Sequence, residues 1–110
     1  MKLICTPLTL EAMNLLDTNT CPESMLESVS LTVGEYQQLW DSGVLETINS
    51  ALGKMIDDYE DESIRFESDL KKCLKLFESN AIPKNPELAK RIIHLNRIAV
   101  EKNTGLFFFF

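Results

Sequence analysis

Four consecutive phenylalanines, Phe107–Phe110, set the first requirement that any fold of this chain must meet. As an extended segment, this run would point Phe107 and Phe109 to one side and the other two rings to the opposite side. So many exposed aromatic rings would promote self-association, so the fold has to cover the run on both sides. We therefore expect the run to be buried in the core of its own domain or to pair with Lys2–Cys5, which also has strand-like composition.

Between these two segments the apolar residues follow a helical period. Thr32 followed by Glu35 forms a capping-box pattern, and Asn85 before Pro86 places a cap and a proline at a helix start. The spacing predicts helices over residues 7–17, 33–40, 44–59, 62–79 and 86–102, with a short helical turn within 22–29 and a connection over 79–84.

A chain of 110 residues has the length of one domain. The expected fold is therefore mostly α: a single helical domain over residues 1–110, built as a small bundle of about five helices. The first and last segments, Lys2–Cys5 and Leu106–Phe110, are the places where short extended structure is expected.

Charge is distributed unevenly along the chain, whose net charge is −6. Residues 1–70 contain 14 acidic and three basic residues, whereas residues 71–110 contain three acidic and eight basic residues. Net negative charge disfavours non-specific binding to nucleic acid or to an anionic membrane, so neither is an expected partner. An acidic protein is suited to a basic partner.

The acidic residues are densest in Asp57–Glu62, which we call the acidic segment. The residues of this segment are the candidate partner-binding residues: Asp57, Asp58, Tyr59, Glu60, Asp61 and Glu62. One interpretation is a solvated surface whose charges pair with Lys71, Lys72 and Lys75; the other is a docking surface for a basic protein. A calcium-binding EF-hand loop is excluded, because its sixth position requires glycine and here holds Glu62.

The basic part of the chain allows a different surface. Lys90, Arg91, His94 and Arg97 share the polar side of the last predicted helix. This side is either a nucleic-acid surface or a solvated face that complements the acidic residues of the same molecule. No helix-turn-helix signature accompanies it, which favours the second interpretation.

The constellations of known enzymes are missing from the sequence. It has one histidine, His94, and lacks the phosphate-binding and nucleophile motifs that mark common enzyme families. Cys5, Cys21 and Cys73 are an odd number without a CxxC pair, so neither a disulfide framework nor a zinc site is expected. We expect no catalytic residue, cofactor or metal, and a reducing, cytoplasmic compartment.

In size, charge and its single carboxylate cluster, the chain resembles bacterial immunity proteins, in particular those of contact-dependent growth inhibition systems. The resemblance implies a partner, the toxin domain of a larger secreted protein and frequently a basic nuclease, which the immunity protein blocks by occlusion. Tyr59 would be the aromatic anchor beside the charges. Two other functions stay open: a helical adaptor whose partner takes up Phe107–Phe110, and a small nucleic-acid-binding regulator that uses the face from Lys90 to Arg97.

Overall fold

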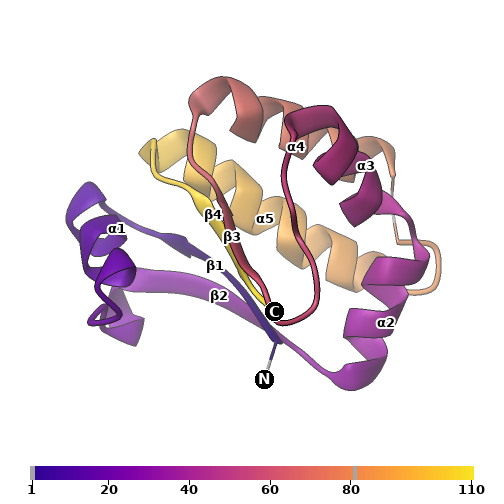
Figure 1. The fold of residues 1–110 in the computed structure, drawn as a ribbon, viewed down its shortest axis with the longest axis horizontal. Coiled ribbons are helices and arrows are strands. Elements are labelled where there is room, and N and C mark those ends of the chain that lie inside the picture. The colour runs from indigo at the N-terminus through magenta and orange to yellow at the C-terminus, as the bar shows by residue number, and fades with distance from the viewer. Residues whose placement is uncertain (1, 81) are drawn as a thin grey trace.

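The computed structural model describes residues 2–80 and 82–110; Met1, and Ala81 in the expected connection over 79–84, lie outside the described residues. Within them, five α-helices pack against a four-stranded antiparallel sheet (Figure 1). The elements in chain order are β1 (Lys2–Pro7), α1 (Leu10–Asp17), the 3₁₀ turn η1 (Glu23–Met25), β2 (Leu26–Leu31), α2 (Val33–Asp41), α3 (Val44–Leu52), β3 (Asp61–Ile64), α4 (Glu67–Ser79), α5 (Pro86–Lys102) and β4 (Leu106–Phe109). The prediction of a mostly helical bundle is therefore wrong.

The two ends of the chain form the centre of the sheet, whose strand order is β2-β1-β4-β3. In the register of β1 and β4, Ile4 lies opposite Phe108 and Cys5 lies opposite Phe107. The expected pairing between the first residues and the phenylalanine run is confirmed. Phe108 is fully buried, and the neighbouring Phe107 and Phe110 are less than 10% exposed.

Both sides of the phenylalanine run are covered, as the sequence requires. On one side Phe108 and Phe110 join the main core, to which α4 and α5 contribute Phe77, Ile92 and other buried residues. On the other side lies α1, whose Leu16 lines the same pocket as Phe107 and Phe109. In Figure 1, α5 passes behind the sheet, and α1 and α2 lie near its opposite ends.

The largest error in the helix prediction lies after α3, which ends at Leu52 and not near residue 59. Gly53 adopts a left-handed backbone conformation, with φ of 64°, and stops the helix. The side chain of Asn49 then bonds both backbone groups of Ile56, at 2.8 and 2.9 Å, which fixes the chain as a loop. Residues 55 and 59 continued the helical spacing in the sequence, yet Met55 and Tyr59 are exposed.

Three predicted helical stretches overlap strands. In the helix predicted over 7–17, Pro7 ends β1 and α1 begins at Leu10, with Thr9 as its N-cap. The turn within 22–29 is helical only in η1, after which β2 buries Val29 and Leu31 at alternate positions. The helix predicted from residue 62 begins at Glu67, because residues 61–64 pair with β4. By contrast, the capping box of Thr32 and the cap at Asn85 are confirmed.

A buried polar clip ties the start of β4 to the end of β1. The hydroxyl of Thr104 donates to the carbonyl of Pro7 at 2.8 Å, and that of Thr6 donates to the carbonyl of Gly105 at 2.9 Å. Gly105 has little room for a side chain, because a Cβ there would lie 3.1 Å from the carbonyl oxygen of Ile64. Among the described residues, no helix is both long and apolar enough to cross a membrane.

Candidate functional site

The acidic segment forms the turn that leads into β3. Five of its residues, Asp57–Asp61, are exposed, and the sixth, Glu62, is half-buried. The six predicted residues form one continuous stretch of the surface loop and strand, although Asp61 and Glu62, as neighbours in β3, point to opposite faces of the sheet. Their proximity follows from their position in the sequence, but the direction of each side chain is set by contacts with distant parts of the fold.

The principal contact is a clamp around the ammonium group of Lys2 in β1. Its Nζ atom donates to Oδ1 of Asp58 at 2.5 Å and to the backbone oxygen of Phe110 at 2.6 Å. The hydroxyl of Tyr36 donates to the same Asp58 oxygen at 2.9 Å. The ammonium also lies 4.9 Å from the ring centroid of Tyr36 and 4.8 Å from that of Tyr59, within the range of cation–π attraction.

The clamp favours the charged forms of both members of the ion pair. Hydrogen bonding from Lys2, and secondly from Tyr36, lowers the pKa of Asp58 below its ordinary value. The bond to Asp58 raises the pKa of Lys2, although partial desolvation opposes this shift. The pair is therefore fully ionised at neutral pH.

Tyr59 is presented outward from a strained turn. Its φ of 62° lies in the left-handed region, which is uncommon for a bulky residue, and its side chain is 88% exposed. The turn is closed by a bond from the backbone N–H of Glu60 to the carbonyl of Asp57 at 3.3 Å. A carboxylate oxygen of Asp57 accepts from the backbone N–H of Asp58 at 2.7 Å. These bonds hold an exposed aromatic ring among carboxylates.

Glu62 has a structural role within the same loop. Its carboxylate accepts the backbone N–H of Ser63 at 2.9 Å and that of Met55 at 3.1 Å, which joins the loop to β3. Asp58 and Glu62 therefore hold the loop, and the other four residues of the acidic segment are exposed. The sequence allowed the acidic segment to pair with lysines of α4. Lys71 instead pairs with Glu67 of the same helix, at 2.9 Å.

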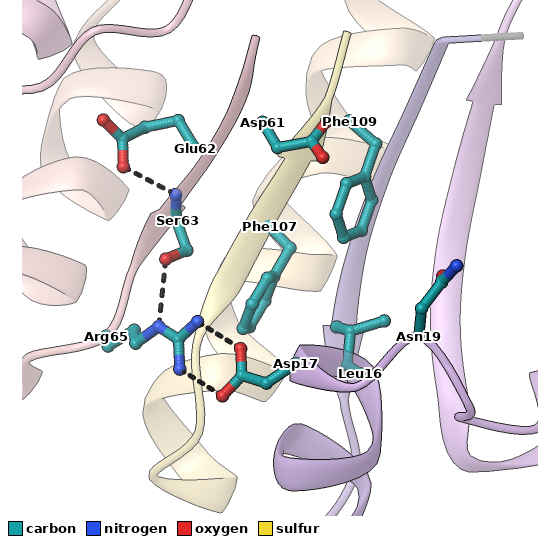
Figure 2. Close-up of a pocket in the computed structure, with 9 residues that line it drawn as sticks. All are labelled: Leu16, Asp17, Asn19, Asp61, Glu62, Ser63, Arg65, Phe107 and Phe109. Carbon is teal, nitrogen blue, oxygen red and sulfur yellow. Dashed lines mark hydrogen bonds and ion pairs between the residues drawn. The ribbon is translucent and has the colours of Figure 1, made fainter.

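A pocket of about 480 Å³ adjoins the acidic segment, between α1 and the β3–β4 side of the sheet (Figure 2). Arg65 binds Asp17 through both terminal nitrogens, at 2.5 and 2.9 Å, and its Nε atom donates to Ser63 at 3.0 Å. Its guanidinium lies 4.8 Å from the ring centroid of Phe107. The hydrogen bonds of this pair lower the pKa of Asp17 and raise that of Arg65.

The mouth of this pocket combines negative charge with aromatic surface. Arg65 is already held by Asp17, whereas Asp61 has no ion-pair partner among the described residues. Asp61 lies opposite the half-buried Phe109 in the register of β3 and β4. Sequence reasoning missed this pocket, because its ion pair joins residues 48 positions apart and no local pattern marks it.

The basic side of α5 is largely compensated within the molecule. Arg91 forms an ion pair with Glu35, and Arg97 pairs with Glu78 at 2.9 Å. Lys90 pairs with Glu87 at 3.2 Å within the helix. This arrangement agrees with the interpretation in which the basic face complements acidic residues of the same chain.

Two of the three cysteines are core residues, and Cys21 is partly exposed. Cys5 and Cys73 are fully buried, and burial raises the pKa of Cys5 to about 12 and that of Cys73 further still. Both thiols are therefore protonated at neutral pH. In residues 2–80 and 82–110, no three histidine, cysteine, aspartate or glutamate side chains are grouped closely enough to hold a metal ion.

The acidic segment is thus the best-defined candidate site on the surface of the described residues. Its charges, its exposed ring and the neighbouring aromatic pocket suit a cationic protein surface. The chain matches no protein-family model, no curated protein and no solved structure.

Proposed function

We propose that the chain is an immunity protein that binds a cognate toxin domain and blocks its active site through the acidic segment. The observation that carries the proposal is the presentation of Tyr59 from a loop that Lys2 clamps to the sheet, with the exposed residues Asp57, Glu60 and Asp61 next to it in the sequence. Such a loop is ordered before its partner arrives, so little conformational entropy is lost on binding. The partner that best fits is a basic nuclease domain.

Inhibition would come from occlusion, without chemistry or a cofactor on this chain. Clustered carboxylates accelerate encounter with a basic surface and meet the lysine and arginine side chains that otherwise contact substrate phosphates. The ring of Tyr59 supplies the desolvated anchor that charges alone do not provide. The pocket beside Asp61 and Phe109 adjoins the end of the acidic segment.

The two other functions have less support. An adaptor that offers Phe107–Phe110 to a partner would need these rings exposed, but three of the four are buried in the domain. A nucleic-acid-binding regulator would need free cations on α5, but Arg91 and Arg97 are bound by carboxylates.

Capture of the partner tests the proposal. The tagged chain is incubated with extract of its native cells and washed at low and then at high salt. We expect one stoichiometric basic protein that is retained at low salt and released as the salt concentration rises. Expression of that protein alone should arrest growth, and co-expression of the chain should restore growth.

A pair of matched variants makes this test specific. In the site variant Asp57→Asn, Glu60→Gln and Asp61→Asn are combined; the control combines Glu11→Gln, Glu46→Gln and Glu101→Gln, which changes the net charge equally at other exposed sites. Only the site variant should lose the partner and the protection. Equal loss in both variants, or recovery of nucleic acid in place of a protein, would contradict the proposal.

A further inference from the structure

The face of the sheet on which α1 lies carries a row of side chains along β3 and β4. In the register of these strands, Asp61 lies opposite Phe109 and Ser63 lies opposite Phe107. Side chains two positions apart share a face, so Arg65 continues the row beyond Phe107. Figure 2 shows Arg65, Phe107 and Phe109 in this order, with Asp61 at the Phe109 end. The row lines the pocket of about 480 Å³ described above.

One end of this row already holds a guanidinium group. The guanidinium of Arg65 lies 4.8 Å from the ring centroid of Phe107, and both of its terminal nitrogens donate to the carboxylate of Asp17. The cation is thus shared by an aromatic ring and a carboxylate, which attract it for different reasons. This arrangement shows, within the same molecule, what kind of cation these two groups accommodate together.

The other end of the row offers a ring and a carboxylate without a cation. Phe109 stacks on Phe107, with 6.1 Å between the ring centroids and 25° between the ring planes, and it is only half-buried. Asp61 beside it is exposed. In the part of the chain that the structure describes, no cation pairs with Asp61 or lies over Phe109, whereas Arg65 balances the charge of Asp17. The negative charge at this end is therefore uncompensated.

The chemistry of this end favours one kind of cation over another. The face of a phenylalanine ring attracts positive charge, and a guanidinium group can stack on it because the group is planar and more weakly hydrated than an ammonium. The forked N–H groups of a guanidinium can at the same time donate to a carboxylate beside the ring. A lysine ammonium is a compact, strongly hydrated charge that does not stack in this way. The pair of Phe109 and Asp61 therefore suits arginine best, as the pair of Phe107 and Asp17 does.

We propose that Phe109 and Asp61 bind the guanidinium group of an arginine side chain on the partner protein. The group stacks on the accessible part of the Phe109 ring and donates to the carboxylate of Asp61, so that a second guanidinium extends the row that Arg65 begins. The inference rests on the proposed function for the source of the arginine, because arginine is the side chain with which proteins preferentially contact the phosphates of nucleic acid. It adds to the anchor at Tyr59 a second, chemically defined contact.

Titration of the full chain with N-acetyl-arginine amide tests the site without the partner. The NMR signals of the Phe109 ring and of the Asp61 backbone amide should shift and saturate, with a dissociation constant in the millimolar range expected of so small a ligand. N-acetyl-lysine amide carries the same charge and should bind more weakly. N-acetyl-norleucine amide is neutral and should cause no saturable shift. A lysine amide that binds as tightly as the arginine amide would overturn the proposal.

Two variants separate the contribution of the ring from that of the charge. Asp61→Asn removes the carboxylate, and Phe109→Leu removes the ring but keeps an apolar side chain. Each should weaken binding of the arginine amide by about threefold or more. The control Glu46→Gln makes the same change in net charge on the exposed surface of α3 and should bind like the wild type. Wild-type binding by a folded Asp61→Asn or Phe109→Leu variant would exclude the site.

These outcomes are distinguishable from those of the proposed function. If a toxin partner is captured but the arginine amide causes no saturable shift at Phe109 or Asp61, the inference is overturned and the proposed function stands. If the arginine amide binds there but no toxin partner is captured, the proposed function fails and the guanidinium site remains. With a captured partner, Asp61→Asn should weaken the complex by about tenfold or more, and Glu46→Gln should not. Equal affinity of Asp61→Asn and the wild type for the partner would refute the assignment of its arginine to this site.

Discussion

The ammonium of Lys2 lies 2.5 Å from a carboxylate oxygen of Asp58, although 56 positions separate the two residues in the chain. Lys2 belongs to β1, a central strand of the sheet, and Asp58 belongs to the loop that carries Tyr59. The ion pair therefore connects a central strand of the sheet to the proposed docking surface. It gives the acidic segment a fixed shape that its composition alone would not.

Replacement of Lys2 should be detectable at Asp58. In Lys2→Met the hydrogen bond that chiefly lowers the pKa of Asp58 is absent, so that pKa should rise toward its ordinary value of 3.8. The pKa of Asp17, which Arg65 lowers, should stay depressed and serves as an internal control. Carboxyl-carbon NMR titration measures both. An unchanged Asp58 midpoint would show that the clamp is not formed in solution.

The ion pair of Arg65 with Asp17 should stabilise the fold only above acidic pH. A lowered carboxyl pKa contributes stability that is present above the unfolded value of 3.8 and is lost as the pH falls through the folded value. The difference in Tm between wild type and Arg65→Met should therefore be largest near about pH 6 and shrink below about pH 4. Asp17→Asn should abolish this pH-dependent part. A difference that stays constant with pH would assign the effect of Arg65 to its packing on Phe107.

Two glycines should respond oppositely to alanine. At Gly105 a Cβ would lie 3.1 Å from both the carbonyl of Ile64 and the ring of Phe107, so Gly105→Ala should lower the free energy of unfolding by about 1–3 kcal/mol. At Gly34, in α2, a Cβ would meet no atom within 4 Å, and Gly34→Ala should raise it by about 0.5 kcal/mol. Urea unfolding measures both. Equal effects would mean that β3 and β4 do not approach each other as closely as described.

Phe108 should be among the least replaceable side chains. It is fully buried between β1 and β3 partners in the core, so Phe108→Ala should lower the free energy of unfolding by about 3–5 kcal/mol. That loss is a large part of the stability of a domain of this size. The conservative change Phe108→Leu should cost less. A fully stable Phe108→Ala variant would be incompatible with burial of the phenylalanine run.

Tyr59 should separate function from stability. Tyr59→Gly removes the strain of a left-handed conformation, so the free energy of unfolding should stay within about 1 kcal/mol of wild type or rise. Removal of the exposed ring should nevertheless weaken binding of the captured partner by about tenfold or more. Binding is measured by calorimetry on the purified pair. A variant that binds normally would exclude Tyr59 as the anchor.

Several elements were predictable because their signals are local. Thr32 with Glu35, and Asn85 with Pro86, mark the starts of α2 and α5 through bonds that reach only three residues along the chain. The pairing of the first strand with Phe107–Phe110 was also predictable, since so apolar a run needs cover on both sides.

The remaining strands depend on contacts that the sequence does not display. β3 offers only Ile64 to the core, so its four residues carry no clear alternation, and pairing with β4 decides their conformation. The left-handed turn at Gly53 likewise overrides the apolar spacing that continued past it. At the candidate site, composition alone singled out the acidic segment, but the contacts of Lys2 and Tyr36 with Asp58 follow from tertiary structure alone.

The position of β4 between β1 and β3 has a consequence for synthesis of the chain. β4 follows every other element in sequence, yet β3 pairs with no other strand of the sheet. On a ribosome, β3 and the inner edge of β1 would emerge long before the strand that joins them. The nascent polypeptide would therefore hold its helices and the β1–β2 pair in a loosely associated state until β4 emerges and joins β1 to β3.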